Sequence, residues 1–142
     1  MLRIRPAGSA DMRPVYELIC TLENRALPKE EFNEIFVSDL ARPSVRYLVS
    51  EEHGSVSGFV SLAMEKQLHH AGLVGTVREL VVAERCRSRG VGASLLRAAE
   101  RIAKEAGCSL VELRCGIRRA RAHAFYERNG WISSHYGFSR RI

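Results

Sequence analysis

The sequence predicts a mixed α/β fold: one domain over residues 1–142, with a central mixed β-sheet of about seven strands flanked by about four helices. Short apolar runs of strand character are interspersed along the chain with segments of helical periodicity. No linker, repeat or low-complexity tract interrupts this order. A chain of this length buries about two-thirds of its unfolded surface, which is enough for one core.

The first half predicts three strands and two helices. Residues 2–5 alternate in polarity and stop at Pro6, and Ser9 can cap a helix that runs to about Asn24. Pro28 suits the first turn of a second helix, residues 29–40. Strands at 45–50 and 57–64 then form a hairpin about His53-Gly54.

The second half predicts four strands and two helices. After a loop at 67–72, an apolar strand runs to Val82 and a helix runs from about Gly90 to Ala106, where Gly107 ends it. The remaining elements are a strand at 110–115, a helix at 119–128 that stops at Asn129-Gly130, and two closing strands at 131–136 and 138–142.

Composition narrows the classes of function. The net charge of +6 comes from arginines that gather on predicted turns, without the interleaved aromatic residues of a single-strand nucleic-acid binder. No apolar run approaches the ~20 residues of a membrane span, no signal peptide opens the chain, and the four cysteines lack metal-site spacing. We therefore expect a cytoplasmic protein that binds a small molecule, and neither nucleic acid nor membrane.

A basic glycine turn stands between the strand that ends at Val82 and the following helix. It reads Arg87-Ser88-Arg89-Gly90-Val91-Gly92. A strand, a glycine turn and a helix start direct backbone N–H groups and a positive dipole end at a phosphate, and glycine lets the backbone approach. A plain packing corner is the alternative interpretation. The turn lacks the Rossmann and Walker patterns. It resembles R-x-x-G-x-G/A, the pyrophosphate motif of the GNAT superfamily of N-acetyltransferases.

A second segment, residues 122–131, resembles the GNAT pattern A-x-x-F-Y-x-x-x-G-F with Trp131 in the last place. The two resemblances together imply a GNAT fold over the whole chain and acetyl-CoA as the cofactor. Arg119 stands where the family often has asparagine. The cofactor-binding residues that the resemblance implies are Leu80, Val81, Val82, Arg87, Ser88, Arg89, Gly90, Val91, Gly92, Ala93, Arg119, Ala122 and Phe125.

Several short segments are similar to the aminoalkylphosphonate N-acetyltransferases of bacterial phosphonate metabolism. The specific ones are Leu68-His69-His70 and Ser134-His135. That resemblance implies a small aminoalkylphosphonate as acceptor and activity linked to a divalent metal, whose ligands the sequence does not identify. It also implies substrate contacts from Arg46, His69, His70 and His135. For the histidines, a solvated loop is the alternative.

Acetyl transfer to an amine needs a base, an oxyanion donor and an acid. Glu79 is our candidate base, with an arginine ion pair as its alternative role. Tyr126 is the candidate acid, with core packing as its alternative. The oxyanion should meet an N–H in residues 80–82, where a strand bulge is expected. Cys86 and Cys115 leave an acyl-cysteine route open, although direct transfer is simpler.

Other functions stay open from the sequence. Another acceptor, such as a polyamine, a drug or a protein amine, is the enzymatic alternative, and a non-catalytic acetyl-CoA sensor is the non-enzymatic one. The sequence also leaves open whether the protein forms a homodimer.

Overall fold

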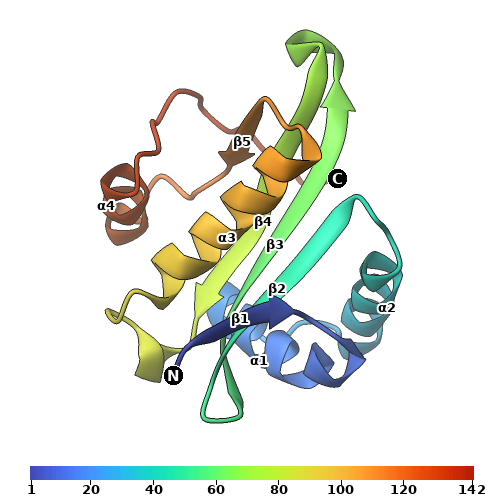
Figure 1. Cartoon of the computed structure of the whole chain (residues 1–142), viewed down its shortest axis with the longest axis vertical. Helices are drawn as coiled ribbons and strands as arrows, with labels where there is room; N and C mark the ends of the chain where they lie inside the picture. Colours follow the sequence, from blue (N-terminus) through green and yellow to red (C-terminus); the bar gives the residue numbers. More distant parts are fainter. The chain divides into compact units, whose positions relative to one another are not determined.

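The computed structural model describes all 142 residues, and the chain divides by its internal contacts into two compact units. The first is Met1–Glu112 and the second is Leu113–Ile142. Figure 1 shows the ribbon of both units.

A five-stranded sheet forms the centre of the first unit. Its strands lie in the order of the chain, and the first four pair with one another in succession as antiparallel strands. Ser109 N–H donates to the Leu73 carbonyl at 2.9 Å, and Val111 lies against Gly75, so the last strand runs parallel to the fourth. The sheet is therefore mixed, as predicted. The strands are β1 (Arg3–Pro6), β2 (Val45–Glu52), β3 (Ser55–Gln67), β4 (Gly72–Val82) and β5 (Leu110–Leu113).

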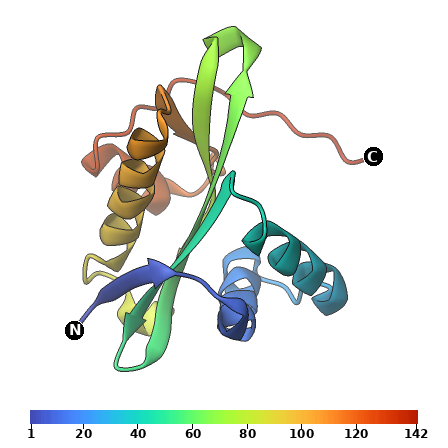
Figure 2. The ribbon, with the colours of Figure 1, turned by 45° about the vertical axis from the view of Figure 1, so that its right-hand side comes forward.

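Helices cover both faces of this sheet. The helices α1 (Met12–Glu23) and α2 (Lys29–Leu40) lie on one face and α3 (Val91–Ala106) lies on the other (Figure 2). The helix α3 buries an apolar stripe and ends at Gly107, whose φ of 93° gives the left-handed cap that the sequence predicts. None of the helices combines the length and apolarity needed to cross a membrane.

Two tight turns join β2 to β3 and β3 to β4. His53 (φ 51°) and Gly54 (φ 78°) turn β2 into β3, in agreement with the predicted hairpin. The long β3–β4 hairpin projects beyond the helices and closes with a 3-10 turn, Leu68–His70, in the predicted loop (Figure 2).

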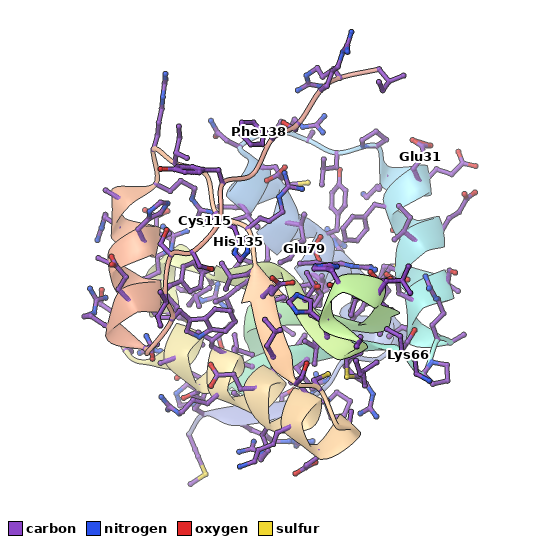
Figure 3. The ribbon with its side chains drawn as sticks, turned by 90° about the horizontal axis from the view of Figure 1, so that it is seen from above. Glu31, Lys66, Glu79, Cys115, His135 and Phe138 are labelled. Carbon is purple, nitrogen blue, oxygen red and sulfur yellow. The ribbon has the colours of Figure 1, made fainter.

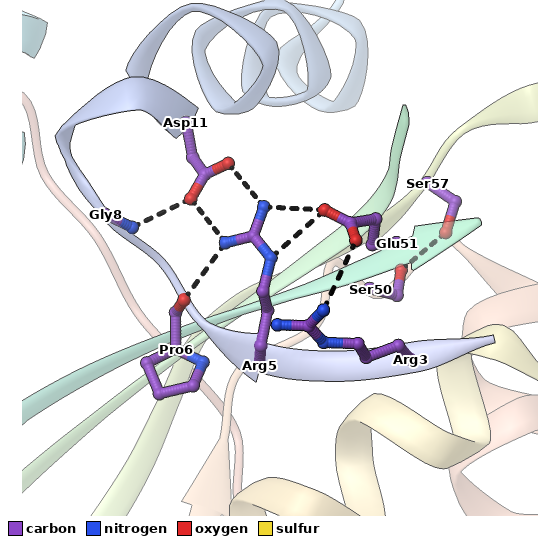
Figure 4. Close-up of polar contacts among 8 residues, drawn as sticks. All are labelled: Arg3, Arg5, Pro6, Gly8, Asp11, Ser50, Glu51 and Ser57. Atoms are coloured by element: carbon purple, nitrogen blue, oxygen red, sulfur yellow. Dashed lines mark hydrogen bonds and ion pairs between the residues drawn. The ribbon is translucent and has the colours of Figure 1, made fainter. Parts of the chain in front are cut away.

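The start of α1 differs from the expectation. Ser9 does not cap the helix; a 3-10 turn, Ser9–Asp11, precedes it, and the Gly8 N–H donates to the Asp11 carboxylate at 2.8 Å. The same carboxylate receives two N–H groups of Arg5 at 2.8 and 2.9 Å (Figure 4). Arg5 also binds Glu51 on β2 at 3.0 Å, so one guanidinium ties together β1, the start of α1 and β2.

The second unit holds one helix, α4 (Ala120–Arg128), which ends at Asn129-Gly130 as predicted. The expectation of strands at 131–136 and 138–142 is wrong: these residues form no strand, and the sheet has five strands rather than about seven. Alternating polarity favours a strand only where a neighbouring strand pairs its backbone and covers its apolar side. Here Ile132, Tyr136 and Phe138 are all at least 85% exposed.

Candidate active site

A β-bulge lies next to the candidate base on β4. Ser61 of β3 stands opposite Glu79, and Leu62 stands opposite Val77, which leaves Arg78 without a partner. We expected the bulge at residues 80–82. It lies at Arg78 instead, because β4 pairs regularly with β3 on both sides of that residue.

The pairing register decides which face of the sheet Glu79 occupies. Tyr47 of β2 pairs with Ser61, which pairs with Glu79, so these three side chains share a face. Tyr47 packs against Phe36 of α2 with ring centroids 5.2 Å apart. Glu79 therefore lies on the α1/α2 side of the sheet, as Figure 3 shows.

Ser61 holds Glu79 in place twice. Its hydroxyl, fully buried, donates to Oε1 of the Glu79 carboxylate and accepts the Glu79 backbone N–H at 3.0 Å. The carboxylate is partly exposed, so its other lone pairs can accept a proton from a ligand. Ser61 thus serves as a positioning residue for the candidate base.

Beyond the bulge, β4 offers backbone donors on the edge away from β3. The Ala83 N–H donates to Ser57 of β3 at 2.8 Å, and the Glu79 N–H also points to β3. Because successive N–H groups of a strand alternate in direction, those of Leu80 and Val82 point to the opposite edge. Two of the three residues expected to supply a donor therefore offer one there, while Val81 points to β3.

The strand β5 does not cover this edge. Val111 is beside Gly75, and β5 ends only two residues later at Leu113. In this parallel register the last residue of β5, Leu113, lies beside Val77 of β4. The five residues that end β4, 78–82, therefore have no β5 residue beside them. The N–H groups of Leu80 and Val82 thus lie along an edge that an extended ligand can pair with.

The start of α3 has the features of an anion site. Ser88 (φ 64°) and Gly90 (φ 81°) both adopt the left-handed conformation, and no side chain caps the helix. The first N–H bonded within the helix is that of Ser94, to the Gly90 carbonyl at 3.1 Å. The N–H groups of Val91, Gly92 and Ala93 therefore have no intrahelical acceptor, and the first turn carries no acidic residue.

The two arginines of the turn have different partners. The Arg87 guanidinium donates to the Val82 carbonyl at 3.2 Å, which ties the turn to the open edge of β4. Arg89 binds the Glu52 carboxylate at 2.9 and 3.0 Å. Because the Arg89 side chain is 56% exposed, this pair contributes little to stability and leaves the guanidinium able to change partners.

Tyr126 is half-buried on α4 in the second unit. Its ring is close to those of Phe125 and Trp131, with centroid distances of 5.3 and 6.1 Å. Burial raises the pKa of the phenol, the nearby Cys115 raises it further, and Arg119 opposes the rise. The hydroxyl therefore keeps its proton at neutral pH, as an acid must.

Three further predicted cofactor residues belong to the second unit. Arg119 stands at the N-cap of α4 and is exposed, while Ala122 and Phe125 are half-buried within the helix. The His123 ring nitrogen bonds to the Gly116 carbonyl at 2.8 Å and fixes the approach to α4.

The structure does not bring the predicted substrate residues of the first unit to Glu79. Arg46 pairs with Leu62, which contacts the α3 side of the sheet, so Arg46 lies on the face opposite to Glu79. His69 and His70 form the tip of the β3–β4 hairpin. At about 3.3 Å per residue, the tip is roughly 25 Å from Glu79 along β4. His135, in the second unit, is exposed and bonds to Ser134 at 2.7 Å.

No three histidine, cysteine, aspartate or glutamate side chains come together in a group that could hold a metal ion. The residues present thus do not fit the divalent metal that the resemblance implies.

Two functional candidates escaped the sequence analysis, Ser61 and Arg78. One signal for the bulge was present: Arg78 and Glu79 are adjacent charges inside an apolar strand. In a regular strand one of them would face the apolar side below α3, and a bulge relieves that conflict. Ser61 carried no signal, because its role depends on the register between two strands.

The family follows from a comparison with known proteins. The profile of the acetyltransferase (GNAT) family matches residues 12–131, most of the chain. The chain belongs to the GNAT family. It is 39% identical to an aminoalkylphosphonate N-acetyltransferase of Salmonella typhimurium, over 98% of this chain and 90% of that protein. The protein is therefore an N-acetyltransferase, and acetyl-CoA is the acetyl donor that its family uses.

Solved acetyltransferase structures share the fold. A putative acetyltransferase from Agrobacterium tumefaciens superposes with a TM-score of 0.89 at 29% identity, covering 99% of both chains. An aminoglycoside N-acetyltransferase in complex with CoA superposes with a TM-score of 0.90, over 100% of this chain and 95% of that one. At 15% identity, the second likeness shows the fold alone.

Proposed function

We propose that this protein transfers an acetyl group from acetyl-CoA to the primary amine of a small aminoalkylphosphonate. One observation carries the choice of acceptor: the 39% identity to the Salmonella enzyme extends over nearly the whole of both chains. Similarity along nearly the full length of both chains favours a shared acceptor class.

The open N–H groups at the start of α3 and the uncovered edge of β4 fit acetyl-CoA. We assign its pyrophosphate to the turn at residues 87–92, where unpaired N–H groups and the helix dipole favour an anion. We assign its extended arm to the open edge of β4, where the N–H group of Val82 can pair with it. The bound cofactor supplies an activated acyl group as a thioester.

Glu79 is the proposed base. An alkylammonium has a pKa near ~10.4, so at neutral pH the acceptor must lose a proton before it can attack. The Glu79 carboxylate takes that proton directly or through a water molecule. Ser61 keeps the carboxylate pointing in one direction, which reduces the reorganisation needed at each turnover.

Two other groups handle the charges that appear during transfer. The N–H group of Leu80 donates to the acyl oxygen as it gains negative charge. Burial keeps Tyr126 protonated, and its hydroxyl donates a proton to the departing sulfur. The second proton that the attacking nitrogen loses returns to Tyr126, so one amine proton leaves on the thiol and the other leaves through Glu79. The transfer is direct; Cys86 is only 5% exposed, which argues against an acyl-cysteine there.

The acceptor is tested by comparing kcat/KM for aminoethylphosphonate, ethylamine and spermidine with acetyl-CoA, each with and without a chelator. We expect aminoethylphosphonate to exceed ethylamine by at least about tenfold, the equivalent of ~1.4 kcal/mol of binding to the phosphonate. A preference for spermidine, or equal values for ethylamine, would show that the acceptor is another amine. Acetyl-CoA binding with no acetylation of any amine would indicate a sensor.

A further inference from the structure

Arg78 faces the same side of the sheet as Glu79. It is the residue left unpaired by the bulge, and its guanidinium Nη1 lies 3.9 Å from Oδ2 of Asp39 on α2. In a regular strand two successive side chains point to opposite faces. The bulge therefore presents a cation and the candidate base, adjacent in the sequence, to one space beside α2.

Asp39 holds the Arg78 guanidinium in place but leaves most of its N–H donors available to another anion. The Asp39 carboxylate is buried and already accepts the Tyr47 hydroxyl at 2.5 Å, and Arg42 lies 3.6 Å from its other oxygen. The Arg78 and Arg42 side chains remain 44% and 56% exposed. Two guanidinium groups thus share one carboxylate, and most of their ten N–H donors are available to a second anion.

The arrangement of charge complements a zwitterion. Glu79 offers a carboxylate for an ammonium group, and the neighbouring Arg78 offers donors that match the oxygens of a phosphonate or carboxylate. An amine without an anionic group would contact Glu79 alone. An amine with an anionic group a few bonds away would contact both Glu79 and Arg78.

We propose that Arg78, supported by Arg42, binds the anionic group of the acceptor and so selects anionic amines. The inference deepens the proposed function and rests on it. It moves to Arg78 the role that the sequence suggested for Arg46, because Arg46 lies on the other face of the sheet.

The test compares kcat/KM for aminoethylphosphonate and ethylamine in four variants. In Arg78→Gln we expect the value for aminoethylphosphonate to fall about 10- to 100-fold through a higher KM, as loss of a charged hydrogen bond implies. The value for ethylamine should change by less than about threefold, because that amine does not reach Arg78. Arg78→Lys keeps the charge without the planar fork and should recover part of the preference. Arg101→Gln, an exposed arginine of α3, is the charge-matched control and should leave both values unchanged.

Arg46→Gln is the fourth variant. Together with further substrates, it separates a failure of the proposed function from a failure of the role given to Arg78. If wild-type enzyme prefers aminoethylphosphonate and only Arg46→Gln abolishes the preference, the proposed function stands and the role of Arg78 is refuted. If wild-type enzyme prefers β-alanine or taurine and Arg78→Gln abolishes that preference, Arg78 selects anions but the phosphonate assignment is wrong. A wild-type enzyme that favours neutral or cationic amines overturns both. An equal loss for both amines in Arg78→Gln would mean that Arg78 is structural, which also overturns the inference.

Discussion

At the scale of single residues, the pKa of the Asp11 carboxyl shows most clearly how hydrogen-bond partners and burial act on one group. The hydrogen bonds from Arg5 lower its pKa, its own burial opposes this, and the Gly8 N–H lowers it further. The carboxylate side chain is 8% exposed and Arg5 is 23% exposed, so water screens the pair only weakly. Stability that depends on a lowered carboxyl pKa is present above the pKa of the unfolded chain, and it is lost as the pH falls through the folded value.

We predict that Asp11→Asn lowers the free energy of unfolding at pH 7 by about 2–3 kcal/mol, because Arg5 loses its strongest partner in a partly buried position. The difference from wild type should begin to shrink below about pH 4, where the carboxyl of the unfolded chain takes up a proton, and should shrink further as the pH falls through the lower pKa of the folded protein. Urea unfolding from pH 7 to pH 3 measures both effects. Glu17→Gln, which breaks the exposed Arg13–Glu17 pair, is the control and should cost no more than about 0.5 kcal/mol. A difference that stays constant with pH would refute this account of Asp11.

The sequence identified candidate residues for the site, but it did not show to which face of the sheet each side chain points. Glu79 stood out as a carboxylate in an apolar strand, and the structure adds Ser61 and the bulge at Arg78. Arg46 and Arg78 look equivalent in the sequence, since each is one cation in a strand. Only the pairing register shows that they point to opposite faces.

At the scale of elements, the turn before α3 carries the cofactor assignment. Its donors are unpaired because the helix begins without a side-chain cap and without an acidic residue. A glycine at position 92 leaves those donors uncovered, and a side chain there would project beside them.

We predict that Gly92→Asp abolishes acetyl-CoA binding without unfolding the protein. A carboxylate in the first turn of a helix stabilises it by about 0.3–1 kcal/mol, so the helix itself should persist while phosphate is repelled. Isothermal calorimetry with acetyl-CoA gives the affinity, and thermal melting checks the fold. Ala106→Asp places the same carboxylate about 21 Å away at the other end of α3, at 1.5 Å per residue, and should leave binding intact. Undiminished affinity in Gly92→Asp would place the pyrophosphate elsewhere.

Elements with local signals agreed closely with the sequence. The helix α2 has the predicted bounds, and α3 ends at the predicted glycine, because a proline start and a glycine stop act within a few residues. The strands expected at 131–136 and 138–142 are absent, since a strand requires a partner that local sequence does not specify. The bulge also depends on pairing, and its position was missed for the same reason.

At the scale of the whole molecule, the proposed chemistry draws on both compact units. The first unit supplies Glu79, the open edge of β4 and the start of α3, and the second supplies Tyr126. Glu79 is proposed to accept a proton and Tyr126 to donate one. The loss of activity on replacing Glu79 should therefore vary with pH differently from the loss on replacing Tyr126.

The pH dependence of kcat/KM in wild type, Glu79→Gln and Tyr126→Phe tests this account most directly. At pH 7, Glu79→Gln should lose about 10²- to 10⁴-fold, the usual contribution of a general base, and the loss should diminish toward pH 10 as free amine accumulates. Tyr126→Phe should lose activity by a roughly constant factor across this range, because burial raises the pKa of the phenol above its ordinary ~10 and the wild-type acid stays protonated. A Glu79→Gln profile parallel to that of wild type, or equal to it, would contradict the assignment of Glu79 as the base.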